Sequence, residues 1–557
     1  MDNLAVHYVQ LSPTCDAIFR RHRSMSFISR RSTGEKRVSI SQEDPDNPPG
    51  AWDAGSPTWE SSHASLLPTT EETRRGRHFA LTPRRLRRIL RRVHVSKIIK
   101  YALFLVLTLV CATPILAPSY TRPPPHYGEL VSRCTGSDAS NGGCANPQQE
   151  KVFISVSLYD QGGHLAAGSW GRRLLELIHL IGPNNVYLSI YENDSGAEGE
   201  GALESLKDRL SCRHRIVSDS HVSTDGFPTV TMPNGNERVK RLAYLSEMRN
   251  RALRPLDLFD ETEWGVKEFD KILFLNDVAF QPLDAANLLF STNLVDGRTE
   301  YLAACGLDFM YPVLFYDLYA QRDAEGFSGG IPIFPFFSTQ GQGISRAAVL
   351  AQSDAVPVKS CWGGIVAMQA KYVQNLDRTL PTPDFQAIGS HVVNPSAPQK
   401  ITAPVRFRNE PEIFFDACEC CLFLADVAQA AKAQGGKELG TYVNPYVRVA
   451  YDESALSWLP WVRRWERLFV LPQWIITKIA GLPTHNPHRT IQEGERFTEE
   501  VWTGPQPGHW QLTERTARNG MFCGVREMQL VQSGDRTEDV NWENNKMPPG
   551  QALDFPT

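Results

Sequence analysis

Short apolar runs alternate with helical patterns from residue 151 onward. Strand-like runs cover residues 152–158, 185–191 and 272–275, and apolar positions recur at helical spacing over residues 170–180 and 240–253. The run 272–275 is too short for a helix and is typical of a strand buried on both faces. Strands and helices that alternate with short connections form parallel sheets with right-handed crossovers. The pattern therefore predicts an α/β fold with a mostly parallel sheet and flanking helices.

The polar side chains that follow the run 272–275 are the first candidates for chemistry. Asn276 and Asp277 stand directly at its carboxyl end, and ligands of open α/β sheets bind at that edge. A carboxylate there suits a hard divalent cation that would hold a diphosphate. A strand that ends in a turn, with Asp277 bonded to the backbone, explains the same residues equally well. Both interpretations stay open at this point.

Two further segments favour a ligand site at the same edge. Glu192 and Asn193 end the second strand-like run, where polar groups can bind a ribose or a base. Asn193 also begins the sequon Asn-Asp-Ser, but a buried site is favoured because a glycan would not fit at this edge. Arg249 and Asn250 lie near the end of the helix that precedes residue 272. A guanidinium matches phosphate oxygens, and a solvated surface arginine is the alternative.

Later segments add aromatic, acidic and thiol groups. Residues Trp362, Gly363 and Gly364 suit either sugar stacking or a tight turn of the core. Downstream of the strand expected over 301–309, acidic residues gather around Asp308. Glu419 and a second carboxylate seven residues later share a helix face if that helix includes Glu419. Its cysteine neighbours predict disulfides or buried thiols rather than zinc, because a second ligand cluster is missing.

The first 150 residues predict a membrane anchor. Residues 1–97 resemble a disordered basic tail, with nine arginines between Arg74 and Arg92. Residues 98–119 form an apolar span of transmembrane length, and a buried core helix is the alternative. The positive-inside rule places the tail in the cytosol and the remainder in the lumen. Residues 120–150 form a stem, in which Cys134 and Cys144 are able to pair.

The C-terminal part predicts less. We place the main domain at residues 151–455, and residues 456–557 form an aromatic and polar extension. The tryptophans at its start suit packing on the core or a position at the membrane surface, and core packing is favoured.

Composition removes several functional classes. The net charge of -4 over 557 residues argues against a nucleic-acid partner, and 11 cysteines favour an oxidising compartment. The chain contains no P-loop, no GxSxG elbow and no HExxH motif, which argues against the hydrolases that use them.

Seven motifs in the same order resemble the fungal glycosyltransferase family 69, which includes the cryptococcal α-1,3-mannosyltransferase and capsule-associated proteins. They cover roughly residues 150–452 and are Ser189-Ile-Tyr-Glu-Asn-Asp-Ser195, Tyr244-Leu-Ser-Glu-Met-Arg-Asn-Arg-Ala-Leu253, Phe274-Leu-Asn-Asp-Val278, Ala304-Cys-Gly-Leu-Asp-Phe309, Ser360-Cys-Trp-Gly-Gly364, Glu419-Cys-Cys-Leu422 and Asn444-Pro-Tyr-Val-Arg-Val-Ala-Tyr451. The resemblance implies a GT-A-like fold and a type II Golgi or secretory-pathway enzyme. It also implies retaining transfer from GDP-mannose to a mannoside glycan with a divalent cation, manganese being expected.

The resemblance also implies roles for individual residues. Asn276-Asp277-Val278 stands where related enzymes carry Asp-X-Asp, so Asp277 is the expected metal ligand, and Asp308 or His391 is a candidate to complete the ligand set. Glu419 and Asp308 are the candidate catalytic carboxylates. The candidate donor-binding residues are Glu192, Asn193, Arg249, Asn250, Asn276, Asp277, Trp362, Gly363 and Gly364. A UDP-sugar donor, or a catalytically silent scaffold of the secretory pathway, is the alternative function.

Overall fold

The computed structural model describes residues 83–136, 142–258, 261–395, 397, 400–435, 438–483, 486–504, 508–532 and 542–544. The tail predicted over residues 1–97 therefore lies outside the described residues up to residue 82. The described residues from Leu107 onward belong to one compact unit, and those before it belong to another. The extension after residue 455 is thus part of the same unit as the predicted main domain.

The apolar span predicted over 98–119 is confirmed as a helix, but this helix starts earlier. Helix α2 covers Pro83–Leu116, and its segment His94–Leu116 is long and apolar enough to cross a membrane. At 1.5 Å per residue its 23 residues reach about 34 Å, against a hydrocarbon core of about 30 Å. The helix continues back into the basic run because Arg and Leu are good helix formers, and a proline stands at its first turn.

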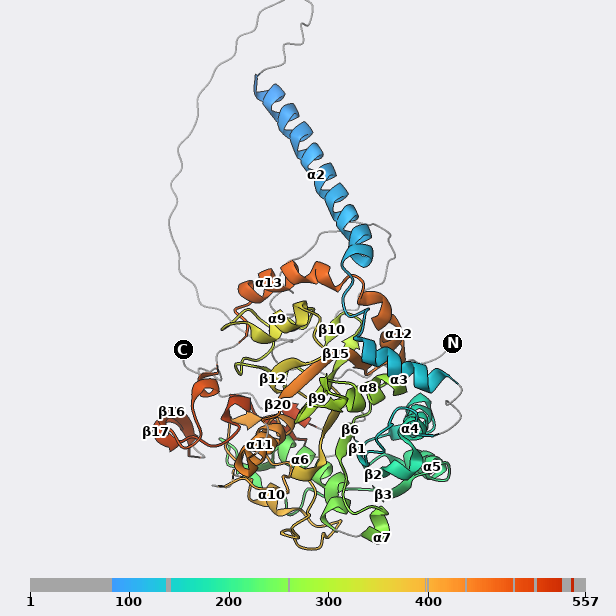
Figure 1. Cartoon of the computed structure of the whole chain (residues 1–557). Coiled ribbons are helices and arrows are strands. Elements are labelled where there is room, and N and C mark those ends of the chain that lie inside the picture. The colour runs from blue at the N-terminus through green and yellow to red at the C-terminus, as the bar shows by residue number, and fades with distance from the viewer. Residues whose placement is uncertain are drawn as a thin grey trace, which may run out of the picture. The chain divides into compact units, whose positions relative to one another are not determined.

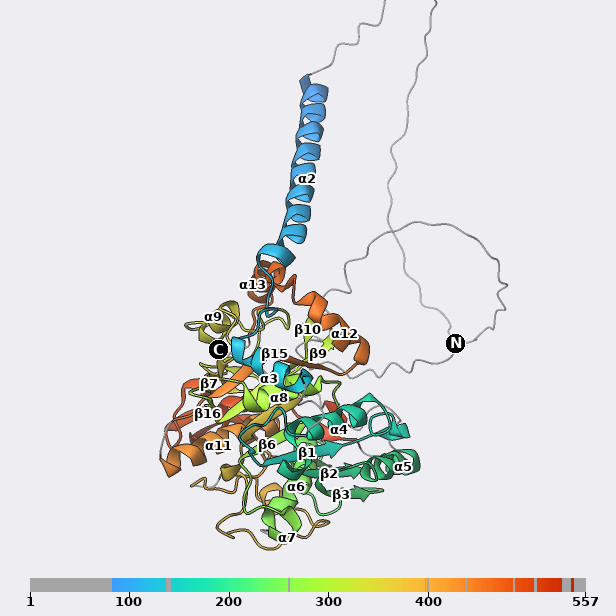
Figure 2. The same ribbon diagram turned by 45° about the vertical axis from the view of Figure 1, so that its right-hand side comes forward.

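A ten-stranded mixed sheet forms the centre of the domain (Figures 1 and 2). Its main order is β11-β12-β15-β9-β13-β6-β1-β2-β3, and β10 pairs with β9. The strands are β1 (Val152–Leu158), β2 (Val186–Asn193), β3 (Arg213–Asp219), β6 (Lys271–Leu275), β9 (Ala303–Tyr311), β10 (Leu314–Phe315), β11 (Arg322–Asp323), β12 (Val356–Ser360), β13 (Ile365–Gln369) and β15 (Thr441–Ala450).

Seven of the ten strands run in one direction, as predicted, and β10, β12 and β13 run the other way. Strands β6, β1, β2 and β3 pair in parallel, and β9 pairs in parallel with β15. Strand β13 lies antiparallel between β6 and β9, and β12 and β11 extend the far edge in antiparallel pairs. The turn at Gly363 and Gly364 leads directly into β13, with no helix between β12 and β13.

The order in which strands are added to the sheet changes direction at β1. The chain proceeds from β1 outward to β2 and β3, and then returns to place β6 on the other side of β1. The carboxyl ends of β1 and β6 thus flank a topological switch point, where open α/β sheets bind their ligands. Asp160 follows β1 and Asp277 follows β6, so the fold brings these two carboxylates to one edge.

Each face of the sheet has its own apolar core. Along β1, Val152, Ile154 and Val156 belong to one core and Phe153 to the other, because successive strand side chains point to opposite faces. Helices α4 and α8 cover the first core, and α11 and α12 contribute to the second. The principal helices are α3 (Pro125–Thr135), α4 (Ser169–Ile181), α5 (Gly196–Lys207), α6 (Arg241–Leu253), α8 (Pro282–Phe290), α9 (Ile344–Leu350), α11 (Glu419–Gln434), α12 (Glu453–Val462) and α13 (Val470–Ile479), with short α7 (Glu261–Trp264) and α10 (Ser390–Val393).

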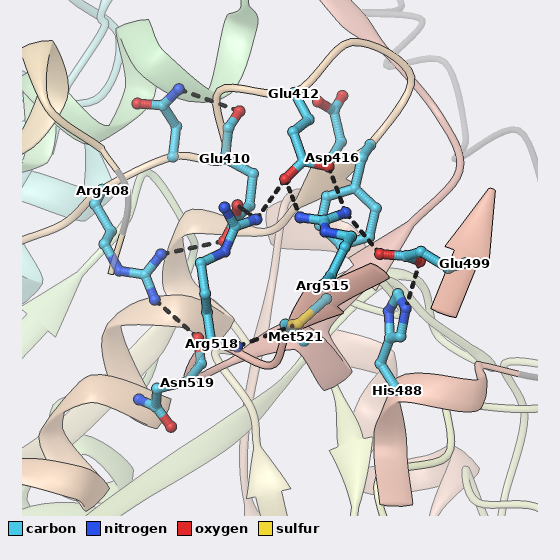
Figure 3. Close-up of polar contacts among 12 residues, drawn as sticks. Arg408, Glu410, Glu412, Asp416, His488, Glu499, Arg515, Arg518, Asn519 and Met521 are labelled. Carbon is cyan, nitrogen blue, oxygen red and sulfur yellow. Dashed lines mark hydrogen bonds and ion pairs between the residues drawn. The ribbon is translucent and has the colours of Figure 1, made fainter. Parts of the chain in front are cut away.

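A buried ionic network attaches the C-terminal segment to the residues before α11 (Figure 3). Glu410 accepts hydrogen bonds from Arg408 and Arg518, and Glu412 pairs with Arg515 and Arg518. The network continues through Arg515 and Glu499 to His488. Buried charges of this kind are tolerated only when they are paired, so the segment 488–518 has to stay docked for the network to be satisfied.

Three disulfides join elements distant in sequence or close a loop. Cys134 and Cys144 pair as the sequence allowed, and the other bonds are Cys305–Cys361 and Cys421–Cys523. The second connects β9 to the turn before β13, and the third connects α11 to the C-terminal segment. Of the described cysteines after the stem, Cys212, Cys418 and Cys420 are free and buried.

Loss of the bond Cys305–Cys361 is expected to destabilise the domain more than loss of Cys134–Cys144. Their sequence separations are 56 and 10, and the chain-entropy model gives about 4 and about 3 kcal/mol respectively. The paired Cys→Ala variants of the full chain in detergent should show this order in denaturant unfolding. Equal midpoints for the two paired variants would contradict it.

Candidate active site

Asp277 is the exposed carboxylate at the switch point. It follows the fully buried β6 and is itself accessible to solvent. Loss of solvation within the surrounding protein is the largest cause that raises the pKa of its carboxyl, and Asp160 adds to this effect while Arg249 opposes it. The Asp160 oxygens already accept the backbone N–H groups of Leu165 and Ala166. Asp277 is therefore the carboxylate at this edge that is accessible to a ligand.

Asn276 is fixed by its neighbours on both sides. Its backbone N–H donates to Gly364 O at 3.0 Å, and its carbonyl accepts from Trp170 Nε1 at 3.0 Å. The side-chain Oδ1 accepts from Trp362 Nε1 at 3.3 Å and from Arg249 Nη1 at 3.5 Å. The side-chain amide of Asn276 thus holds Trp362 and Arg249 in place. The next residue, Asp277, is exposed to solvent.

Arg249 is a partly buried cation between α6 and α11. Its Nε donates to Glu419 Oε1 at 3.0 Å, and its guanidinium lies over the Trp362 ring at 4.9 Å from the centroid. Burial lowers the pKa of this guanidinium, but Cys420 and Glu419 outweigh burial, and the pKa lies above its ordinary value. Arg249 is therefore a permanent positive charge whose direction is fixed from several sides.

Glu419 is the first residue of α11 and is buried. The carboxylate receives Arg249 on Oε1, where the Cys420 thiol also donates at 3.4 Å, and the Cys418 thiol donates to Oε2 at 3.8 Å. The helix N-terminus also favours a negative charge at this position. Helix α11 does include Glu419, so Asp426 shares its face, but Asp426 instead pairs with Arg408 and Asn519.

The segment Trp362-Gly363-Gly364 forms a tight turn against the core. The Trp362 side chain is packed between Phe274 and Phe407, and only 4 % of the residue is exposed. A Cβ on Gly363, which has a φ of +58°, would lie 2.2 Å from Gly306 O. This geometry matches the core-turn interpretation of the sequence, and Trp362 reaches the site through its indole N–H.

Asp308 and Asp317 form a second acidic centre beside this turn. Asp308 is buried and accepts Tyr451 Oη and the backbone N–H of Asp317, both at 3.1 Å. Asp317 accepts the N–H groups of Ala320 and Gly363. Burial is the first cause that raises the pKa of both carboxyls, and Asp317 raises the pKa of Asp308 further.

The two acidic centres belong to one site. Loss of solvation is the largest cause that raises the pKa of the Tyr451 hydroxyl, and Asp308, Asp277 and Asp317 all raise it further. Burial is the largest cause that raises the pKa of Tyr316 to about 12, and the same three carboxylates contribute. The sequence singled out Asp277 and Asp308, but it did not single out Tyr316 or Tyr451 as partners. Only their positions in the sequence could have pointed to them: Tyr451 directly follows a strand-like run, and Tyr316 directly precedes the carboxylate of Asp317.

Three predicted donor-binding residues make mainly structural contacts. Asn250 exchanges two hydrogen bonds of 2.8 Å with the backbone of Phe407. Glu192 accepts the N–H of Ser195 and the hydroxyl of Ser218, and Asn193 donates to Tyr244 and Asp194. These contacts shape the end of β2. Their role in donor binding stays a prediction.

The alternative metal ligands of the sequence lie in other surroundings. Burial lowers the pKa of His391 to about 4, and its charged neighbours are Arg406, Asp426 and Arg408, none of which is in the site. Cys418, Glu419 and Cys420 offer ligand atoms within 4.8 Å of one another. However, Glu419 is already neutralised by Arg249, so this cluster is better described as two thiols that donate to a paired carboxylate.

The buried acidic pair predicts a pH-dependent stability. Because the folded-state pKa of Asp308 lies above its unfolded value, the folded state binds more protons between these two values, and stability falls as pH rises through that window. Asp308→Asn should reduce the loss of melting temperature between about pH 4 and pH 7, since an ordinary Asp titrates near 3.9. Asp296→Asn is the matched control, at an exposed hairpin position with a φ of +48° that Asn also adopts. A pH profile of Asp308→Asn identical to that of the wild type would contradict this assignment.

Comparison with known proteins is consistent with this geometry. The sequence model of a family described as cryptococcal mannosyltransferase 1 matches residues 151–426, which include Arg249, Asp277, Asp308 and Glu419. No curated protein matches the chain. A solved structure, the mannosyltransferase PcManGT from Pyrobaculum calidifontis in complex with GDP-Man and Mn2+, aligns over 69% of this chain and 76% of its own, with 11% identity and a TM-score of 0.29. That likeness is too distant to assign a ligand or a residue role. The family match confirms the resemblance drawn from the motifs: residues 151–426 match the cryptococcal mannosyltransferase family, and the chain is a glycosyltransferase.

Proposed function

We propose that this chain is a type II membrane mannosyltransferase that uses GDP-mannose and a divalent cation. The observation that carries the proposal is the exposed carboxylate of Asp277 beside the fixed guanidinium of Arg249 at the switch point. A nucleotide diphosphate requires positive charge on its oxygens, and a carboxylate supplies it only through a cation. Arg249 would meet the same phosphate oxygens directly.

The donor set at Asp277 fits a magnesium or manganese ion. Such ions need one or two protein carboxylates and take their other ligands from water and substrate phosphates. Loss of solvation and the neighbouring Asp160 raise the pKa of Asp277, and a bound cation would oppose both effects by favouring the charged carboxylate. When bound, the cation would act as a Lewis acid on the leaving diphosphate. Manganese is our choice because the resemblance implies it.

The remaining residues then act on the donor and the reacting sugar. Arg249 would stabilise the charge that builds on the leaving diphosphate, a role in which preorganisation matters most. Trp362 and Asn276 hold Arg249 and shape the floor of the site. We keep Glu419 and Asp308 as the candidate carboxylates near the anomeric carbon, with retention of configuration. The acceptor is proposed as an α-mannoside and the linkage as α-1,3, both from the family resemblance.

The proposed topology follows from charge and disulfides. The arginine-rich run before His94 favours a cytosolic N-terminus, which places the site on the lumenal side of a Golgi or secretory membrane. Three disulfides lie after α2 and two of them within the domain, which suits an oxidising compartment.

The first test is transfer itself. The purified full chain with GDP-mannose, Mn2+ and an α-mannoside should form a new linkage, and chelation of the metal should abolish it. Asp277→Asn should reduce kcat/KM by about 10²–10³-fold, since it removes the charge that holds the cation. Asp296→Asn is expected to retain full activity. If transfer occurred only from a UDP-sugar, the proposed donor would be wrong. If no donor supported transfer, the alternative of a catalytically silent scaffold would be favoured.

The second test separates positioning from reaction at Glu419. If Glu419 acts by orienting Arg249, then Glu419→Gln and Arg249→Lys should each raise KM for GDP-mannose. Their combination should fall short of additivity by about 1–3 kcal/mol, as expected for residues in contact. Asp296→Asn should be additive with Arg249→Lys. A loss confined to kcat in Glu419→Gln, with KM unchanged, would instead make Glu419 the reacting carboxylate.

A further inference from the structure

Helix α13 buries its uncharged polar residues and exposes its large apolar residues. Gln473 and Thr477, one turn apart, are buried, and they bond to Arg346 and to the backbone N–H of Ile331. The outward side consists of large apolar residues, of which Ile479 is 83 % and Leu471 62 % exposed. A water-soluble surface helix has the opposite arrangement, so this face is built for an apolar neighbour.

Helix α12 extends the same kind of surface. Its inward residues are apolar core residues, yet Trp458 and Trp461 are 58 % and 55 % exposed. Among the described residues after Leu116, these two helices hold seven of the exposed large apolar side chains, namely Trp458, Trp461, Leu471, Trp474, Ile475, Ile476 and Ile479. We call this set the α12–α13 face. Figures 1 and 2 both place the two helices at one end of the domain, with α7 at the opposite end.

This face lies next to the end of the apolar segment of α2. The backbone N–H of Ser119 donates to Arg463 O at 3.0 Å, and Arg463 Nη1 donates to Tyr120 O at 3.3 Å. Arg463 directly follows α12. Ser119 stands three residues after Leu116, so the chain allows at most about 11 Å between the helix end and this attachment. If the segment His94–Leu116 spans a bilayer, the start of the α12–α13 face has to lie at the surface of that bilayer.

The chemistry of the face suits the boundary between headgroups and acyl chains. Tryptophan is enriched at that depth, where its ring is buried and its N–H stays hydrated. The exposed Arg464 lies over the Trp461 ring at 5.2 Å from the centroid, and the exposed Lys478 flanks Ile479. Basic side chains at the edge of an apolar face can reach lipid phosphates while their stems remain in the apolar layer.

We propose that the α12–α13 face inserts into the lumenal leaflet as a second, monotopic membrane contact that fixes the orientation of the catalytic domain. The inference rests on the anchoring part of the proposed function. A flexible stem would let the domain rotate freely above the membrane. Two contacts, one through α2 and one through this face, instead hold the site at a constant height and direction.

The test uses the full chain reconstituted into phosphatidylcholine vesicles. Cys111→Ser removes the exposed free cysteine of the described residues, and Cys15→Ser removes the cysteine that lies outside them; Cys212, Cys418 and Cys420 are buried. Ile479→Cys and Leu471→Cys each receive an environment-sensitive nitrobenzoxadiazole label. Both labels should show blue-shifted emission and lose intensity when the lipids carry brominated acyl chains. Leu512→Cys, at a position 68 % exposed on the hairpin of β16 (Arg496–Thr503) and β17 (His509–Thr516), is the matched control. Its label should remain red-shifted and respond to aqueous iodide.

Three results would overturn the proposal. Labels at positions 471 and 479 that behave like the label at 512 would show a face in water. A blue shift without lipid quenching, lost when the protein is diluted among vesicles, would assign the face to a second copy of the chain. If alkaline washing released the wild-type chain from the vesicles, α2 would not be a membrane-spanning anchor, and the proposal would lose its basis. Mannosyl transfer measured on the same vesicles keeps the two proposals apart, because quenching with no transfer refutes the activity and leaves the membrane contact standing.

Discussion

The ion pair between Arg249 and Glu419 is the interaction on which the site depends. It joins α6 to the first turn of α11, and the same guanidinium contacts Asn276 after β6 and Trp362 before β13. Four elements distant in sequence thus meet around one cation. A buried charge is costly unless its partners are held in place, so each of these elements constrains the others. The position of the exposed Asp277 follows from that constraint, because its neighbour Asn276 is one of the groups that hold the cation.

Disulfides and ion pairs elsewhere in the domain hold in place the elements that surround the Arg249–Glu419 pair. The bond Cys305–Cys361 fixes the strand that carries Asp308 to the turn that carries Trp362. The bond Cys421–Cys523 fixes the first turn of α11 to the C-terminal segment, which the network around Glu410 and Glu412 also retains. Lys240, at the start of α6, pairs with the buried Asp416 just before α11. The C-terminal segment therefore holds α6 and α11 in position through the Arg241–Gln529 hydrogen bond and the Cys421–Cys523 disulfide. It contributes none of the described residues of the site.

Much of this arrangement could be predicted from the sequence, and the failures have physical causes. Strand β1 is found at the predicted residues because a strand buried on both faces is a continuous apolar run between polar ends. The place of Asp277 just after a buried strand could be predicted because β6 is likewise a continuous apolar run, and its role as a ligand stays a prediction. The antiparallel β13 could not be predicted, since a short apolar run carries no information about direction. The inward Gln473 and Thr477 were equally hidden, because a helix pattern shows that two faces differ but not which one meets the protein.

The single carboxylate at positions 276 and 277 is a consequence of the charges around it. Asp277, Asp308 and Asp317 already have raised pKa values within one site, so a further aspartate would add repulsion where solvation is poor. Two unit charges 4 Å apart interact by about 4 kcal/mol at an effective dielectric constant of 20. An aspartate at position 276 would also compete with Glu419 for Arg249 and draw the guanidinium out of its ion pair. The amide of Asn276 accepts the same two hydrogen bonds without that charge. In the proposed function, the residue that breaks the Asp-X-Asp pattern would thus leave Arg249 in its ion pair with Glu419, and the second negative charge that a cation needs would come from the leaving diphosphate.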